Sequence, residues 1–410
     1  NSTSAEAFGS IAIGALYDGS NALDDNDAQT AKQTVAKSST GQPFKYNMAI
    51  GAGAASEGNN AIAIGTLAKT TTKQQNVVSP DRAVALGYYA ASSAEKANAI
   101  GERATATEAN ANAFGSQAYA GGVSATAIGS AASASGTNSI AMGSNQRVTA
   151  ANSGSIGYAG KLDLATTGRN LGGTYDPNAT LVKGDGTYSI GNTNSEILSN
   201  QSGVFGNDNF VQGKENIRVV GNSNIISKNN QTPAAGASAV PTSLKNVYVT
   251  GHGNKVDVGV APLEDSKNIF VMGAGNIIGD SSTAKNITDT YVIGTGNKVS
   301  ESNELTTTDD PSDPAATKTK IGKGYFILGN NVNATLQNSV YLGTNSAFIE
   351  AGTASAGKDA YTQFKPEGKT AGMPAYKYAG GEAVGVVTIG KKDYQENIEE
   401  TRRLQGVAAG

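Results

Sequence analysis

The sequence predicts an all-β protein folded as a solenoid, a parallel β-roll of short coils with long loop insertions. Three observations lead to this prediction. Glycine recurs at a fixed step of 14 residues. Each of these glycines ends a short segment in which bulky aliphatic residues alternate with alanine. The composition, with 52 glycines, no tryptophan and only 6% aromatic residues, suits a thin stacked core better than a wide globular one.

The 14-residue step is clearest in the first third of the chain. In one uninterrupted run each glycine lies 14 residues from the next: Gly101, Gly115, Gly129, Gly143 and Gly157. Upstream, Gly51 and Gly65 keep the same step, and Gly14 opens the array. A coil of this length has room for two short strands and two tight turns, with the glycine at a turn.

The alternating segments, such as Ala61–Ile64 and Ala83–Leu86, have the period of two that indicates a strand. Because neither set of residues is polar, both strand faces are expected to be buried. One face can point into the narrow coil, and the other has to pack outside it, most simply against another copy of the chain. The candidates for a buried coil position or a subunit interface are Ile62, Ile64, Leu86, Ile100, Ile128, Met142 and Ile156.

The repeat changes after Gly157, where the coils become wider and more interrupted. Asparagine now recurs three residues after glycine, at Asn194, Asn209, Asn224, Asn254, Asn276 and Asn297. Asparagine tolerates the left-handed turn conformation, and stacked copies can form a hydrogen-bonded ladder, which we favour over a ligand site. We therefore divide the chain into residues 1–157, with an insertion at 15–46, and residues 158–390, with several insertions.

Insertions in repeat proteins form surface loops, often on the binding face. The first and last large insertions are the aromatic ones, and aromatic side chains on loops are candidate receptor anchors. Packing of these rings onto the coils, or between subunits, is the alternative. The receptor-binding candidates are Tyr17, Phe44, Tyr46, Phe348, Tyr361, Phe364, Tyr376 and Tyr378.

The sequence shows no pattern for catalysis, a cofactor or a metal. The net charge of -3 and the lack of basic runs indicate no nucleic-acid partner. Cysteine is absent, and the single histidine, His252, sits at a turn position without a metal-binding pattern around it. The Gly251–Asn254 turn lacks the lysine and the following helix of a phosphate loop.

The coils at Ser10–Gly14, Asn47–Gly51, Asn60–Gly65 and Asn138–Gly143 resemble the head of YadA-like trimeric autotransporter adhesins. The segment Glu400–Gly410, which reads ETRRLQGVAAG, is similar to the start of the neck that joins head to stalk in this family. We therefore assign residues 391–410 to a neck segment. The interrupted coils after Gly157 depart from the family's head repeat and are similar to the heads of fusobacterial adhesins that bind CEACAM receptors.

The resemblance implies a homotrimer of left-handed parallel β-rolls on the bacterial surface. It also implies an outer-membrane anchor, supplied by a C-terminal stalk and barrel that these residues do not include. The expected partner is a host cell-surface protein, such as a CEACAM receptor, or extracellular matrix. Two other functions stay open: a monomeric β-helix enzyme that degrades polysaccharide, and a passive spacer in a surface fibre.

Overall fold

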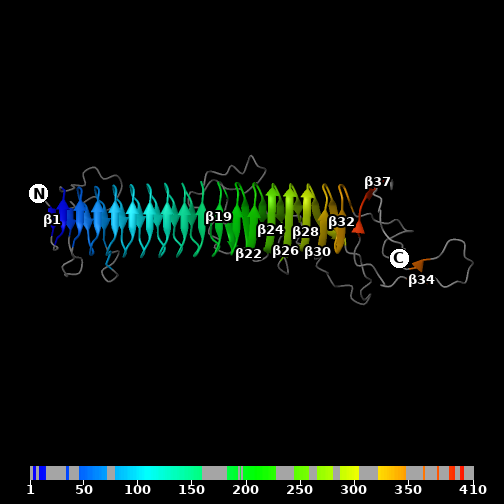
Figure 1. Ribbon diagram of the computed structural model, residues 1–410, viewed down its shortest axis with the longest axis horizontal. Coiled ribbons are helices and arrows are strands. Elements are labelled where there is room, and N and C mark those ends of the chain that lie inside the picture. Colours follow the sequence, from blue (N-terminus) through cyan, green and yellow to red (C-terminus); the bar gives the residue numbers. More distant parts are fainter. Residues whose placement is uncertain are drawn as a thin grey trace, which may run out of the picture. The chain divides into compact units, whose positions relative to one another are not determined.

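The computed structural model is all-β in the part of the chain that it describes, and its strands stack as a parallel solenoid (Figure 1). The predicted fold class is therefore confirmed. The described residues form two compact units, one ending at Asp208 and the other beginning at Asn209. The described ranges are 3–5, 9–14, 34–36, 46–71, 79–158, 182–192, 194, 197–227, 244–257, 266–279, 287–303, 322–347, 363–364, 376–377, 387–392 and 398–400.

The first unit has two strand faces. One face carries the strands that end in the repeat glycines: β2 (Ile11–Ile13), β4 (Met48–Ile50), β6 (Ile62–Ile64), β8 (Val84–Leu86), β10 (Asn98–Ile100), β12 (Asn112–Phe114), β14 (Thr126–Ile128), β16 (Ile140–Met142), β18 (Gly154–Ile156), β19 (Tyr188–Ile190) and β21 (Gly203–Phe205). The other face carries β1 (Thr3–Ala5), β3 (Thr34–Ala36), β5 (Ala55–Ser56), β7 (Lys69–Thr70), β9 (Ala91–Ser92), β11 (Thr105–Ala106), β13 (Tyr119–Ala120), β15 (Ser133–Ala134) and β17 (Arg147–Val148), with β20 (Ile197–Asn200) continuing it through the bridging residue Val182.

Alanine fills most inward positions of the 14-residue coils. In the coil that begins at Asn98, the inward positions are Ala99, Ala104, Ala106 and Ala111, each with no exposed surface. In-register pairing places Ala99 directly against the alanines of the coils before and after it. The coil is narrow, so most inward positions hold small side chains, and this explains the alternation of alanine with bulky residues.

The repeat glycines bring successive coils close together. Gly115 has a φ of 134°, which side-chain-bearing residues rarely adopt. A Cβ atom at this position would lie 2.5 Å from the carbonyl oxygen of Gly129. The amide of Gly115 donates to the carbonyl oxygen of Ile100 at 2.8 Å, so the glycine also joins the hydrogen-bonded ladder along the coils.

The turns of each coil also use left-handed residues other than glycine, which the sequence pattern did not reveal. In one coil these are Arg103 (φ 54°) and Asn110 (φ 58°), and in the next they are Gln117 (φ 58°) and Ser124 (φ 57°). Their amides donate to the preceding coil; that of Arg103, for example, lies 2.8 Å from the carbonyl oxygen of Tyr88. The stacking bonds thus hold a conformation that costs about 1 kcal/mol or more per residue.

The second unit has longer strands. Its first face holds the C-terminal part of β22 (Phe210–Val220), β24 (Leu244–His252), β26 (Ser266–Ala274), β28 (Ile287–Thr295), β30 (Gly322–Leu328), β32 (Ser339–Leu342) and β35 (Val387–Thr388), while the first residues of β22 pair with the second face. Its second face holds β23 (Ile225–Ser227), β25 (Lys255–Asp257), β27 (Ile277–Ile278), β29 (Lys298–Asn303) and β31 (Asn333–Leu336). Two short antiparallel pairs also occur: β33 (Gln363–Phe364) with β34 (Tyr376–Lys377), and β36 (Lys391–Lys392) with β37 (Ile398–Glu400).

The predicted asparagine ladder runs through the second unit. The amide nitrogen of Asn254 donates to Oδ1 of Asn224 at 3.0 Å and to the carbonyl oxygen of Gly273 at 2.8 Å. Its own Oδ1 accepts from the side chain of Asn276 at 2.9 Å and from the backbone of Asn276 at 3.1 Å. Asn254 is fully buried, and the same bonds recur at Asn276 and Asn297. The structural role predicted for this row is confirmed.

The domain boundary at residue 157 and the neck at 391–410 stay predictions. Within the proposed neck, β36 and β37 pair with each other, and residues 401–410 lie outside the described part of the chain.

Replacing Gly115 with alanine should destabilise the first unit by about 3 kcal/mol or more, because the Cβ is strained and meets backbone. Chemical denaturation would measure the loss. The control is Ser116→Ala, at a half-buried neighbour with no such conformation. If both substitutions lowered the free energy of unfolding by the same small amount, the coils would be able to move apart at Gly115, and the prediction would be wrong.

A second prediction concerns two buried tyrosines. Burial raises the pKa of Tyr325 above its ordinary value of 10.0, and Tyr341 beside it raises this pKa further. The folded state therefore keeps a proton that the unfolded chain releases, so stability is full below about pH 10 and falls as the pH rises further.

Replacing Tyr325 with phenylalanine should make the free energy of unfolding less dependent on pH between about 10 and 12. It also removes a buried hydroxyl that has no hydrogen-bond partner among the described residues. The exposed Tyr158→Phe is the control, and an unchanged alkaline profile in Tyr325→Phe would contradict the prediction.

Candidate binding surface

Opposite the buried alanines, the first unit presents a row of bulky apolar side chains, which we call the apolar column. It consists of the last residue of each glycine-ended strand: Ile13, Ile50, Ile64, Leu86, Ile100, Phe114, Ile128, Met142, Ile156, Ile190 and Phe205. Five of these side chains are exposed in the single chain, among them Ile156 at 41% and Phe205 at 54%, and the other six are partly buried. An exposed apolar row of this length is typical of a surface that another molecule covers.

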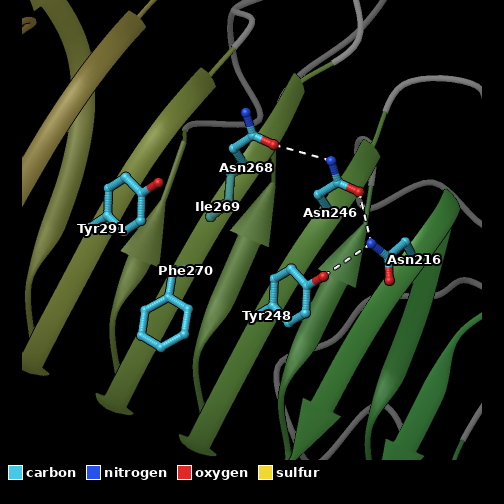
Figure 2. A pocket seen from close by; sticks show the side chains of 7 residues that line it. All are labelled: Asn216, Asn246, Tyr248, Asn268, Ile269, Phe270 and Tyr291. Atoms are coloured by element: carbon cyan, nitrogen blue, oxygen red, sulfur yellow. Dashed lines mark hydrogen bonds between the residues drawn. The ribbon is translucent and has the colours of Figure 1, made fainter.

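The second unit carries a different surface, which we call the amide–aromatic groove (Figure 2). It is lined by Asn216, Asn246, Tyr248, Asn268, Ile269, Phe270 and Tyr291. The strands β22, β24, β26 and β28 supply these residues, and parallel pairing aligns them in two rows. Figure 2 shows the amides in one row and the rings of Tyr248, Phe270 and Tyr291 in the row beside it.

The amide row is a second hydrogen-bonded ladder, distinct from the buried one. Asn216 donates to Oδ1 of Asn246 at 2.8 Å, and Asn246 donates to Oδ1 of Asn268 at 3.1 Å. Asn268 in turn donates to a carboxylate oxygen of Asp289 at 2.8 Å. Asn216 also donates to the hydroxyl of Tyr248 at 3.0 Å, which ties the amide row to the aromatic row.

The backbone explains which residue types stand in the amide row. Asn216, Asn246, Asn268 and Asp289 all have φ values between 52° and 57°, and Gly324 continues the series at 73°. Asparagine, aspartate and glycine are the residues that adopt this left-handed conformation at least cost. The left-handed conformation at this outward position of each strand therefore favours asparagine, aspartate or glycine there.

The chain was compared with known proteins. The family model of the YadA head domain repeat matches it twice, at residues 48–68 and 120–145. The chain therefore carries YadA head domain repeats in these two stretches. Repeats of this kind build the surface-exposed heads of trimeric autotransporter adhesins. No curated protein matches the chain.

The seven apolar candidates from the sequence all lie on the outward side of the head's coils. Six of them, from Ile64 to Ile156, belong to the apolar column, and Ile62 stands two residues before Ile64 on the same strand. Leu86, Met142 and Ile156 are exposed, and the others are half-buried. Alanines occupy the interior of these coils, so the seven residues do not fill a buried coil position. Their role at a subunit interface stays a prediction.

The aromatic candidates are described only in part. Tyr46 is 58% exposed, and its ring lies where a Cβ of Gly9 would be. Phe364 and Tyr376 are paired residues of the antiparallel strands β33 and β34. The remaining candidates lie outside the described residues: Tyr17, Phe44, Phe348, Tyr361 and Tyr378. Their role in receptor binding stays a prediction.

The described residues hold no cluster that resembles a metal site. His252 is exposed at the end of β24, and no three His, Asp or Glu residues of the described ranges come together to hold an ion. None of the described elements is a helix that could cross a membrane.

Sequence reasoning missed the amide–aromatic groove, although the signal is present. The segments Asn246–Tyr248, Asn268–Phe270 and Asp289–Tyr291 each place Asn or Asp two residues before an aromatic residue. A spacing of two on a strand puts both side chains on one face. The glycine repeat is the stronger signal in these segments, and the insertions space this shorter pattern unevenly along the chain.

Proposed function

We propose that the chain is the head of a homotrimeric adhesin, anchored at the outer membrane, that binds a host cell-surface receptor or a matrix protein and has no catalytic role. The observation that carries this proposal is the apolar column. The coils of the first unit are already filled mostly by alanine, so a lone chain leaves the outward apolar side chains of the column partly exposed. Symmetrical packing of identical columns would cover them all at once.

The two alternatives receive less support. A polysaccharide-degrading enzyme needs a cleft with paired carboxylic acids, whereas the coil interior is filled with methyl groups and the buried amide ladder. A passive spacer would need neither the aromatic insertions nor the amide–aromatic groove. Both features give the head surfaces suited to recognition.

Replacing Ile64 with aspartate should prevent trimer assembly, because each subunit would bring an unpaired carboxylate into the apolar contact. Sedimentation velocity on the wild type and the variant would measure this. The matched control is Ser133→Asp, which adds the same charge on the opposite strand face, in β15. A monomeric wild type, or a normal trimer of Ile64→Asp, would refute the proposed interface.

Receptor binding is proposed for the aromatic insertions. Deleting residues 350–380 removes Tyr361, Phe364, Tyr376 and Tyr378 and should abolish binding to the receptor. The first screen would test the trimer-verified head against immobilised host surface proteins, with CEACAM receptors among them, and against matrix proteins. A deletion variant that stays trimeric and binds as well as the wild type would place the receptor site elsewhere.

A further inference from the structure

We propose that Arg218 of one chain forms an ion pair with the partner subunit's Glu215, and that this pair fixes the axial alignment of the subunits. The proposal rests on the proposed homotrimer and deepens it, because the pair exists only where the outward strand faces of two copies meet. It is carried by two residues of β22 whose charges depart from the rows to which they belong.

The second unit has an outward, mostly apolar row of its own, made of the residues that precede the repeat glycines. Parallel pairing aligns these residues, which are Val220, Thr250, Met272, Ile293, Leu328 and Leu342. Val220, Met272 and Leu328 are 51%, 44% and 47% exposed in the single chain. This row matches the apolar column in its position before the glycine, so a second copy of the chain is its expected cover.

A row of similar side chains aligns two chains only weakly along the roll. Successive coils are separated by about 4.8 Å, so a displacement of one coil would exchange Met272 for Ile293 and leave the contact apolar. In coiled coils, the same ambiguity is removed by a polar residue in the apolar seam and by charged residues beside it. Residues that interrupt the rows can remove the ambiguity here in the same way.

Arg218 interrupts one of the outward rows. It stands three residues before Gly221, at a position that aromatic residues fill in the next coils. The aligned residues are Arg218, Tyr248, Phe270, Tyr291, Phe326 and Val340. Arg218 is the one charged residue of this row, and it is exposed in the single chain.

Glu215 interrupts the neighbouring row, at the corner where the strands begin to face outward. The aligned residues there are Glu215, Lys245, Lys267, Thr288 and Lys323. Glu215 is the one acidic residue of a row that otherwise holds lysines and a threonine. The two exceptions have opposite charges and lie three residues apart on one strand, which indicates a paired role.

Symmetry supplies each arginine with an acid at its own level. In a closed trimer equivalent residues lie at equal heights, so β22 of one chain is level with β22 of the next. A guanidinium that a neighbouring chain covers loses water and requires a counter-charge. Arginine and carboxylate groups form strong charge-assisted pairs, so the partner subunit's Glu215 is the group that meets this requirement.

The contacts within one chain leave room for this pair. The side chain of Glu215 is 42% exposed, and Nζ of Lys245 lies 3.7 Å from its Oε1. The guanidinium of Arg218 has five N–H groups, and Nη1 donates to the carbonyl oxygen of Ile217 at 3.2 Å. Both side chains can therefore reach a neighbour without the loss of a buried contact.

A displaced chain would lose the pair and meet repulsion. Moving the partner by one coil replaces Glu215 with Lys245, and moving it by two coils replaces it with Lys267. Each displacement puts a second cation beside Arg218, and like charges at an interface are unfavourable. Movement in the opposite direction also takes the acid away from the arginine. The charges therefore favour the aligned trimer and oppose displaced ones.

The competing explanation is a contact within one chain, because Arg218 and Glu215 share a strand. Such a contact would stabilise each subunit but would not act between copies. Exchange of the two charges between chains separates the two explanations.

The test uses the full 410-residue chain. Sedimentation equilibrium would measure trimer dissociation, and circular dichroism would verify that each variant is folded. Arg218→Glu and Glu215→Arg should each raise the concentration at which half of the trimer dissociates by about tenfold or more, because like charges then meet at every subunit contact. The variant with both substitutions should return to within about threefold of the wild type, since the pair is restored with its charges exchanged.

A mixture of the two single variants distinguishes a contact between chains from a contact within a chain. The Arg218→Glu and Glu215→Arg chains, unfolded together and refolded, should assemble better than either chain alone. A closed trimer of two chain types keeps at least one contact between like chains, so the recovery should be partial. The control is Lys298→Glu, which reverses an exposed charge on the second strand face, in β29, and should assemble like the wild type.

The effect on alignment is tested by a shift of the acid along the roll. Glu215→Lys combined with Lys245→Glu keeps the net charge and the pairing of lysine with glutamate within the chain, but moves the acid by one coil. In the aligned trimer of this variant, Arg218 meets a lysine. We therefore expect it to assemble as poorly as Glu215→Arg.

Failure of the homotrimer and failure of the ion pair give different results. A monomeric wild type would refute both. A trimeric wild type whose single charge reversals assemble normally would refute the ion pair alone. The same conclusion would follow if the double variant or the mixture showed no recovery, and normal assembly of the variant with the shifted acid would refute the role in alignment.

Discussion

The close approach of successive coils at their glycines is the constraint on which the rest of this structure depends. At Gly115 a Cβ would lie 2.5 Å from the next coil's carbonyl oxygen, and at Gly251 it would lie 1.8 Å from that of Gly273. With this contact in place, the coils stack in register, and residues at equivalent coil positions form rows along the roll. Rows of similar side chains follow directly, because a parallel in-register stack aligns equivalent positions.

Stacking in register has different consequences inside and outside the coil. Inside, the first unit is filled mostly by alanine, and the second unit combines aliphatic side chains such as Val249 and Val271 with the buried asparagine ladder around Asn254. Outside, stacking lines up the partly exposed side chains of successive coils, so that together they form a continuous surface. The apolar column is suited to covering by a large partner, and we assign it to subunit assembly. In the second unit, the same stacking aligns the amides and the rings of the amide–aromatic groove in two rows.

Much of the fold could be predicted because the sequence repeats. The glycine step and the alternation of alanine with aliphatic residues indicated the solenoid, and the recurrence of asparagine indicated the buried ladder. The YadA head repeat was recognisable from the same residues, at 48–68 and 120–145. The candidate sites were harder. The aromatic insertions have no repeat, so the pattern gives no position for Tyr361 or Phe364 relative to the coils.

The sequence by itself thus determined the coil length, the alternation of alanine with bulky residues and the rows that stacking creates, since all three are one-dimensional periodicities. Only the tertiary structure decided which face of each strand is outward, and that Ile64 and its equivalents stay half exposed there. It also decided that Asn246 and Tyr248 stand beside their counterparts on neighbouring strands, although insertions separate them unevenly along the chain. The physical reason is that hydrogen bonds between adjacent strands decide which residues lie side by side. The insertions fall between the strands in the sequence, so they change the spacing there but leave the pairing of the strands in register.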